Sequence, residues 1–229
     1  MRYQLRVVVA AIVCWAPTTT SRAVVIDDYS VGAIALVRDT AAIIHTQSGL
    51  DPSHVAGGSR NMTVGWGGGS AGQSIVVDTA DRTMTLASGP TSLGYFSVEY
   101  GSVASPLGID LAANGENQLQ VIFKRTGGSG AFLTQPPSIS VSSPTGSRQL
   151  AFAPPASLGG DRYLSRAAFS DNSTVDFRNL SRLSFQFVRY SRDYSLTLYG
   201  IESVQIPEPA TVSLGIAGLI LLSAAARRR

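Results

Sequence analysis

Apolar and polar residues alternate at a period of two through the middle of this 229-residue chain. The pattern is clearest in five stretches, where large apolar side chains take every second position: Met84 and Leu86; Leu119, Val121 and Phe123; Ile139 and Val141; Leu183, Phe185 and Phe187; Leu196 and Leu198. Such alternation is typical of a β-strand with one buried and one wetted face, as the strands of antiparallel sheets have. We therefore predict an all-β domain of antiparallel strands.

Turn signals rich in glycine and proline separate these stretches at short intervals, among them Gly57-Gly58, Asn114-Gly115 and Pro136-Pro137. No stretch between residues 24 and 204 sustains the periodicity of an amphipathic helix, although residues 161–168 are expected to form a short helical turn. The pattern predicts one domain over residues 24–204, folded as a two-sheet β-sandwich. A domain of this length can bury a core without disulfides or metals.

The C-terminal segment predicts a membrane span. It has three parts in order: the motif Pro207-Glu208-Pro209, the uncharged run 210–226, and the terminal Arg227, Arg228 and Arg229. As a helix, the uncharged run would be about 26 Å long, close to the roughly 30 Å hydrocarbon core of a bilayer. The terminal arginines predict that this end stays cytoplasmic and that everything before the motif lies on the other side. An ordinary C-terminal membrane anchor is the simpler alternative.

The run Pro207-Glu208-Pro209-Ala210-Thr211, followed by residues 214–219 and the arginine cluster, closely resembles the PEP-CTERM sorting signal of exported bacterial proteins. The resemblance covers about a tenth of the chain. It implies recognition by an exosortase, a membrane-embedded enzyme that removes the tail near the motif. It also implies a transient stay in the inner membrane through the C-terminal helix, and then release to the cell surface or an exopolysaccharide matrix.

The N-terminal segment predicts a secretory signal peptide over residues 1–23. Arg2 and Arg6 precede an apolar run, and Ser21 and Ala23 supply the small residues that signal peptidase needs for cleavage after Ala23. Cys14 raises the alternative of a lipoprotein, but it lies inside the apolar run and directly after a large valine. Cys14 is then lost on export, so the mature chain has no disulfide and no thiolate.

The charge of the mature chain differs from that of the whole sequence. Six of the 18 Lys and Arg residues lie in the two terminal segments, which leaves 12 against all 15 Asp and Glu, a net charge of −3. A nucleic-acid-binding protein would carry a basic stripe with aromatic platforms. Only short basic pairs such as Lys124 with Arg125 are present, and we exclude nucleic acid as a partner.

A second resemblance concerns the region between the two signals. It is carried by four pieces: Val25-Ile26-Asp27-Asp28-Tyr29; Gly57 to Val64; Ile109 to Ala112 with Asn117; and Val175 to Leu180. These pieces look like the ectodomain that often accompanies the PEP-CTERM signal, which is similar to galactose-binding-like jelly rolls. Asn61 stands where an aspartate is expected. The resemblance implies a jelly roll, a fold that hosts carbohydrate binding, adhesion and structural roles alike.

Residues suited to catalysis are few, and we predict a protein that is not an enzyme. The two histidines, His45 and His54, lack metal-ligand spacing and a nearby acidic partner in the sequence, and are expected in solvated loops. Asp51, Ser53 and His54 lie too close together to form a catalytic triad. Glycoside hydrolysis needs two carboxylates facing each other across a cleft, and nothing in the sequence pairs the available ones, Glu99, Asp110 and Glu116 among them.

A calcium site is one candidate for binding. Asp27 and Asp28 follow the first predicted strand, and Glu202 lies near the end of the last one. In jelly rolls of this sort the first and last strands are neighbours, so these oxygen ligands could gather around Ca²⁺. The alternative is a solvated strand end with one aspartate paired to an arginine such as Arg60. No other cofactor is expected.

A sugar-binding face is the other candidate, because aromatic rings stack on pyranose rings while polar side chains bind the hydroxyls. Tyr95, Tyr190 and Tyr194 are the best placed, at expected strand ends or turns. Further candidates are Trp66, Tyr100, Tyr163 and Tyr199. The alternative for all of them is a place in the core.

These observations predict an exported, exosortase-processed protein of the cell surface or extracellular matrix, without catalytic activity and with polysaccharide as a potential partner. Its processing enzymes would be signal peptidase and exosortase. A secreted glycan-active hydrolase is one alternative, and an inert structural subunit of the matrix is another.

Overall fold

The computed structural model describes residues 23–65, 72–89, 95–102, 104–113, 115–127, 138–153, 156–159, 162–169, 174–188 and 194–205. The predicted signal peptide up to residue 22 and the segment 206–229, with the sorting motif and the apolar run, lie outside these residues. No helix in the described part of the chain has the length and apolarity that crossing a bilayer requires.

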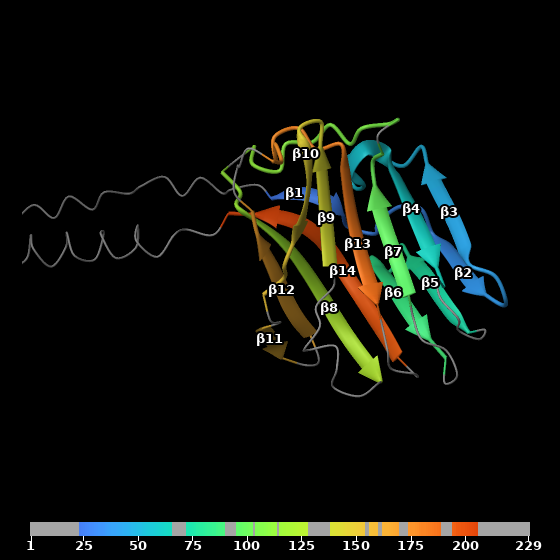
Figure 1. Ribbon diagram of the computed structural model, residues 1–229. Coiled ribbons are helices and arrows are strands. Elements are labelled where there is room, and N and C mark those ends of the chain that lie inside the picture. The colour runs from blue at the N-terminus through green and yellow to red at the C-terminus, as the bar shows by residue number, and fades with distance from the viewer. Residues whose placement is uncertain are drawn as a thin grey trace, which may run out of the picture.

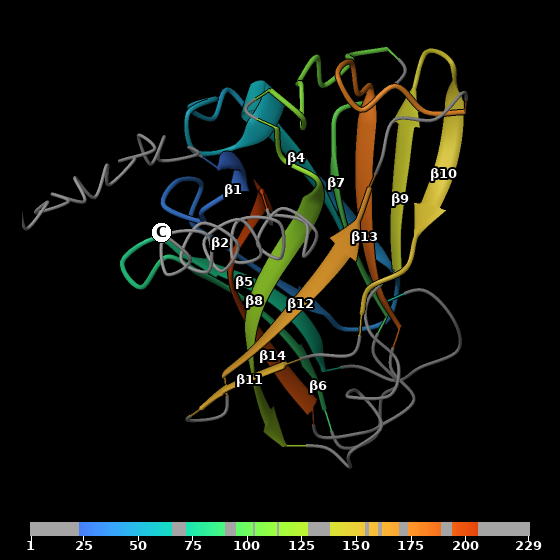
Figure 2. The same cartoon turned by 90° about the vertical axis from the view of Figure 1, so that its left-hand side faces the viewer.

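The domain is an antiparallel two-sheet β-sandwich, as the alternation predicted, and the two layers are separate in Figures 1 and 2. The back sheet has the order β11-β12-β8-β14-β6-β5-β2, with β1 added on β14. Its strands are β1 (Val24–Asp27), β2 (Ile34–Arg38), β5 (Gln73–Asp78), β6 (Thr83–Ser88), β8 (Gln118–Gly127), β11 (Ala156–Gly159), β12 (Arg162–Ala168) and β14 (Tyr194–Val204).

The front sheet, nearer the viewer in Figure 1, has the order β10-β9-β13-β7-β4-β3. Its strands are β3 (Ile43–Ser48), β4 (Ser59–Val64), β7 (Tyr95–Tyr100), β9 (Ser138–Ser143), β10 (Gly146–Leu150) and β13 (Arg182–Val188). The described residues contain one helical element, the 3-10 turn η1 (Ala56–Gly58).

The core lies between the sheets and is built from the residues that the alternation singled out. Leu119, Val121 and Phe123 of β8 are buried, and so are Leu183, Phe185 and Phe187 of β13. Burying a side chain of this size stabilises a fold by roughly 1.5–3 kcal/mol. The polar residues between them face outward, which makes the outer faces of the sheets the surfaces of interest.

The expected helical turn at residues 161–168 is wrong, because Arg162–Ala168 forms strand β12 against β8. Its buried positions are Ser165 and Ala167, opposite Val121 and Leu119. These small residues give little apolar signal, so the period of two was hidden.

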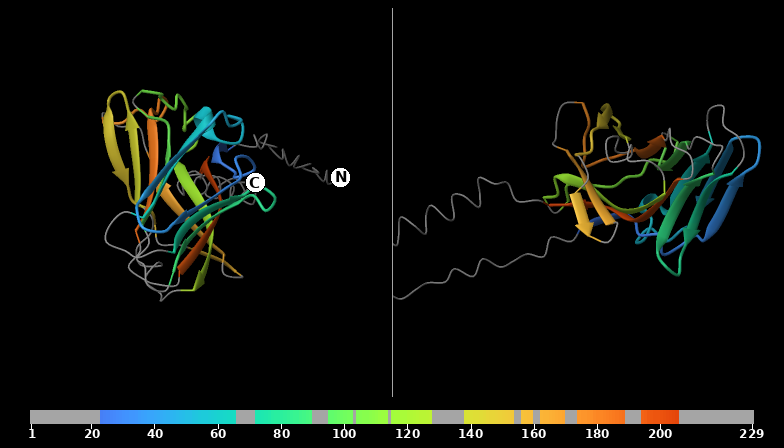
Figure 3. Two further views of the ribbon diagram at one scale, coloured as in Figure 1. Left: turned by 90° about the vertical axis from the view of Figure 1, so that its right-hand side faces the viewer. Right: turned by 90° about the horizontal axis from the view of Figure 1, so that it is seen from below.

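The first and last strands are neighbours, as predicted. Val24 pairs with Ser203 and Val25 with Glu202, while β14 itself lies between β8 and β6. The described chain therefore begins and ends at one edge of the molecule (Figure 3).

Candidate functional site

Asp27 is buried in the core. Its carboxylate accepts hydrogen bonds from Arg60 Nη1 at 2.8 Å, Tyr100 Oη at 2.9 Å and the backbone N–H of Tyr29 at 2.9 Å. Burial raises the pKa of Asp27 above its ordinary value, and Arg60 opposes that rise. The predicted alternative, an aspartate paired with Arg60, is confirmed, but the pair is buried, where a solvated strand end was expected.

Asp28 faces a different set of partners. It accepts hydrogen bonds from Ser30 Oγ at 2.6 Å and from the Ser30 backbone, and its Oδ2 lies 2.8 Å from His54 Nδ1. Partial burial opposes its ionisation, but the hydrogen bonds from Ser30 and His54 outweigh that effect and lower the pKa of Asp28. His54 lies in a turn, as expected, and has an acidic partner 26 residues away that the sequence did not reveal. His45 was placed wrongly, since it lies on strand β3.

Glu202 lies on the opposite face of the back sheet from Asp27. It is opposite Val25 on β1, where its Oε1 accepts a hydrogen bond from Gln120 Nε2 at 2.8 Å, whereas a shift of register on β1 turns Asp27 into the core. The described residues hold no group of three acidic, histidine or cysteine side chains that could bind a metal. The structure therefore does not bring the three predicted ligands together.

The predicted tyrosines are scattered. Tyr95 stands partly exposed on β7, where partial burial and the nearby Glu99 carboxylate raise its pKa. Tyr194 begins β14, and Tyr190 and Trp66 lie outside the described residues. Tyr100 belongs to the core, edge-on to Phe185. Tyr163 is partly buried and stacks on the core residue Phe123 at a centroid distance of 5.7 Å, close to the alternative of a place in the core.

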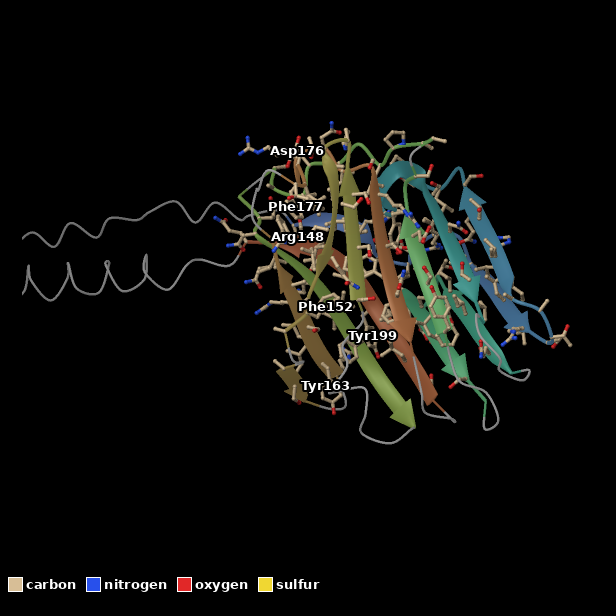
Figure 4. The ribbon with its side chains drawn as sticks, viewed as in Figure 1. Arg148, Phe152, Tyr163, Asp176, Phe177 and Tyr199 are labelled. Carbon is tan, nitrogen blue, oxygen red and sulfur yellow. The ribbon has the colours of Figure 1, made fainter. Side chains whose placement is uncertain are left out.

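Tyr199, which Figure 4 labels on β14, lies at a bulge between Leu198 and Gly200. The bulge carries its side chain outward, and the guanidinium of Arg162 on β12 lies over its ring, 4.5 Å from the centroid. This cation–π contact joins β12 to β14 across the intervening strand β8. Because Arg162 is exposed, this contact lies at the surface.

Three rows of side chains cross β12, β8 and β14 on this outer face, which we call the three-row face. Register places them as follows: Arg166, Gln120 and Glu202; Leu164, Ile122 and Gly200; Arg162, Lys124 and Thr197, with Tyr199 beside the last row. Neighbouring rows are about 7 Å apart along a strand. A partly exposed apolar row thus runs between two polar rows.

The first row is a chain of hydrogen bonds. Arg166 Nε donates to Gln120 Oε1 at 2.9 Å, and Gln120 Nε2 donates to Glu202 Oε1 at 2.8 Å. Each side chain is thereby held in place, and Gln120 is buried beneath its neighbours. Donors and acceptors alternate along the row, which is the arrangement that adjacent hydroxyl groups can bind.

Glu99, Asp110 and Ser53, which were considered for hydrolysis, each have a partner in the structure. Glu99 pairs with Arg182 on the front sheet, and the carboxylate of Asp110 accepts the backbone N–H of Ala112. Ser53 Oγ donates to Asp51 at 2.7 Å, whereas His54 contacts Asp28. Ser53 thus contacts Asp51 and His54 contacts Asp28, which is not the serine–histidine–aspartate order of contacts that a triad has.

No family model matches the chain, and no curated protein matches it. Among solved structures it is similar to a family 11 carbohydrate-binding module of a cellulosomal cellulase of Clostridium thermocellum, with 10% identity, a TM-score of 0.34, and 82% of this chain and 96% of that module covered. It is also similar to a family 11 module from Clostridium thermocellum in complex with a β-1,3-1,4-mixed-linked tetrasaccharide, with 10% identity and a TM-score of 0.32. This match covers 81% of this chain and 97% of that module. A third similar structure is an exo-β-agarase, with 11% identity, a TM-score of 0.36, and 82% of this chain and 25% of that chain covered. TM-scores this low mean that the strands superpose poorly, so these likenesses assign no ligand to this chain.

Proposed function

We propose that this protein is exported, processed by an exosortase at its C-terminal signal, and retained at the cell surface or in the extracellular matrix, where the three-row face binds glycan without catalysis. The finer fold assignment, a galactose-binding-like jelly roll, belongs to the same proposal. The sequence motifs at the two ends support the export route, and the geometry of the back sheet supports the binding.

The observation that carries the glycan proposal is the combination on one face of an outward tyrosine, an apolar row and a fixed row of donors and acceptors. A pyranose ring offers apolar C–H faces and equatorial hydroxyls. The partly exposed row of Leu164 and Ile122, beside Tyr199, matches the apolar C–H faces. The row of Arg166, Gln120 and Glu202 matches the hydroxyls. The face contains one carboxylate, Glu202, so it lacks the facing pair that glycoside hydrolysis uses.

Replacement of Tyr199 by alanine tests the binding site. We expect Tyr199→Ala to weaken retention of the full-length chain, in a mild detergent, on polysaccharide-containing gels by about tenfold or more. The reason is that Tyr199 adjoins the apolar row and holds Arg162 over its ring. Tyr95→Ala, on the front sheet, is the matched control and should leave retention unchanged. A thermal melt of each variant checks folding.

Equal loss with both tyrosine variants would contradict this location of the site. If no polysaccharide in a broad panel retains the wild-type chain, binding is overturned and the structural-subunit alternative gains support.

Mass spectrometry of the protein released by its native host tests the export proposal. We expect a polypeptide that begins at Val24 and ends near Pro207-Glu208-Pro209, because both signals would have been removed. Full-length polypeptide dissolved in the cytosol, with both ends intact, would contradict the proposed route.

A further inference from the structure

We infer that the three-row face selects an acidic polysaccharide whose sugars carry carboxylates, that is, a polyuronate. This inference deepens the proposed function and rests on it. It comes from the charges on the face, which the glycan proposal above does not use.

Cations predominate on this face. Lys124 and Arg162 stand directly opposite each other on β8 and β12. Arg166 is opposite Gln120 in the other polar row, beyond the apolar row of Leu164 and Ile122. The single carboxylate is Glu202, which is bound to Gln120. Three positive groups thus face one negative group, although the chain from Val24 to Pro209 has a net charge of −3.

A like-charged pair directly opposite on neighbouring strands destabilises a sheet, so the juxtaposition of Lys124 and Arg162 calls for a counter-charge. In the described part of the chain, none of the three cations forms an ion pair. The contrast with the front sheet is clear, because Arg182 there pairs with Glu99. An anionic ligand would supply the missing partner.

Arg162 is suited to a planar carboxylate. Its guanidinium is held over the Tyr199 ring, which fixes the plane of its N–H donors, and such a fork binds a carboxylate through two parallel hydrogen bonds. A uronate ring stacked near Tyr199 would bring its own carboxylate to this edge, between Arg162 and Lys124. Sugar stacking and charge recognition then occur at one point, which favours a polyuronate over a detached small anion.

The test compares retention of the full-length chain, in a mild detergent, by polygalacturonate, by the same polymer after its carboxyl groups have been reduced to alcohols, and by a sulfated neutral polymer. We expect polygalacturonate to retain the chain about tenfold or more strongly than the reduced polymer does. The difference in retention should shrink in salt because exposed charges are screened. Arg162→Gln and, independently, Lys124→Gln should remove most of this preference. Arg182→Gln on the front sheet is the matched control and should keep it.

Each outcome bears on the inference. Equal retention of the native and carboxyl-reduced polymers overturns it and leaves glycan binding standing, whereas absence of retention by every polymer overturns the proposed function itself. A preference for the sulfated polymer alone overturns the choice of carboxylate. If Arg162→Gln does not fold, the polymer preferences of Lys124→Gln and Arg162→Lys test the inference instead. A preference for polygalacturonate that is unchanged in Lys124→Gln contradicts the inference.

Discussion

At the scale of single residues, the neighbours Asp27 and Asp28 respond in opposite ways to their surroundings. Asp27 enters the core and has Arg60 and Tyr100 as partners, whereas Asp28 stays near the surface with Ser30 and His54. The pKa of Asp27 is raised by burial and that of Asp28 is lowered by its hydrogen bonds. Their effects on stability therefore have opposite signs as the pH changes.

Asp28→Asn tests this difference. A carboxyl group whose folded pKa lies below its unfolded value near 3.8 stabilises the fold above that value, and the stabilisation is lost as the pH falls through the folded pKa. Asp27, whose pKa is raised, changes stability with pH in the opposite direction. Because wild type and Asp28→Asn both contain Asp27, its effect cancels in the comparison. We expect the melting temperature of wild type to exceed that of Asp28→Asn at pH 6 and the gap to close below about pH 4. A gap that stays constant over this range would contradict the assignment.

At the scale of elements, β14 decides whether the back sheet forms. It is the last strand in the sequence, yet it pairs with β8 on one side and with β6 and β1 on the other. Its inner face buries Leu196, Leu198 and Ile201. We therefore expect the sandwich to close only when the final strand is present.

Truncation tests the role of this strand. A chain of residues 24–193 should show no cooperative unfolding transition in urea, because β8 and β6 lose their shared partner and the core is left open. A chain of residues 24–205 is the matched control and should unfold cooperatively. Cooperative unfolding of the shorter chain would contradict the central role of β14.

The strands that the sequence predicted are those whose inward positions hold large apolar side chains, such as Phe185 and Phe187 on β13. Strand β12 was missed because Ser165 and Ala167 fill its inward positions. The pairing of β1 with β14 was predicted, but the faces of the sheet on which Asp27 and Glu202 lie were not. A register shift on β1 and a bulge on β14 set those faces, and neither leaves a signal in the residue types.

The contacts of the three-row face were hidden from the sequence for a similar reason. Arg162 and Tyr199 are 37 positions apart and meet across an intervening strand. Alternation predicted that Gln120 and Lys124 would be solvent-exposed, but only the register of β12 against β8 shows which side chains they accompany. Tertiary pairing, which local pattern does not contain, assembles this site.

At the scale of the whole molecule, the two sheets present different outer surfaces. The front sheet carries serine, threonine and amide side chains with Glu99 neutralised by Arg182, whereas the back sheet carries Lys124, Arg162 and Arg166 on the neighbouring strands β8 and β12. The positive face belongs to a mature chain that is negative overall. We expect a ligand to approach the molecule from one side.

The position of Tyr199 and Glu202 on β14 has a mechanical consequence. Gln205, where the described chain ends, directly follows β14 and is six positions beyond Tyr199, about 20 Å at most. Tension between a polymer held at Tyr199 and an anchor attached beyond Gln205 would run along this short length of backbone. The share of the load that enters through Tyr199 and Glu202 would reach such an anchor along β14, without crossing the core.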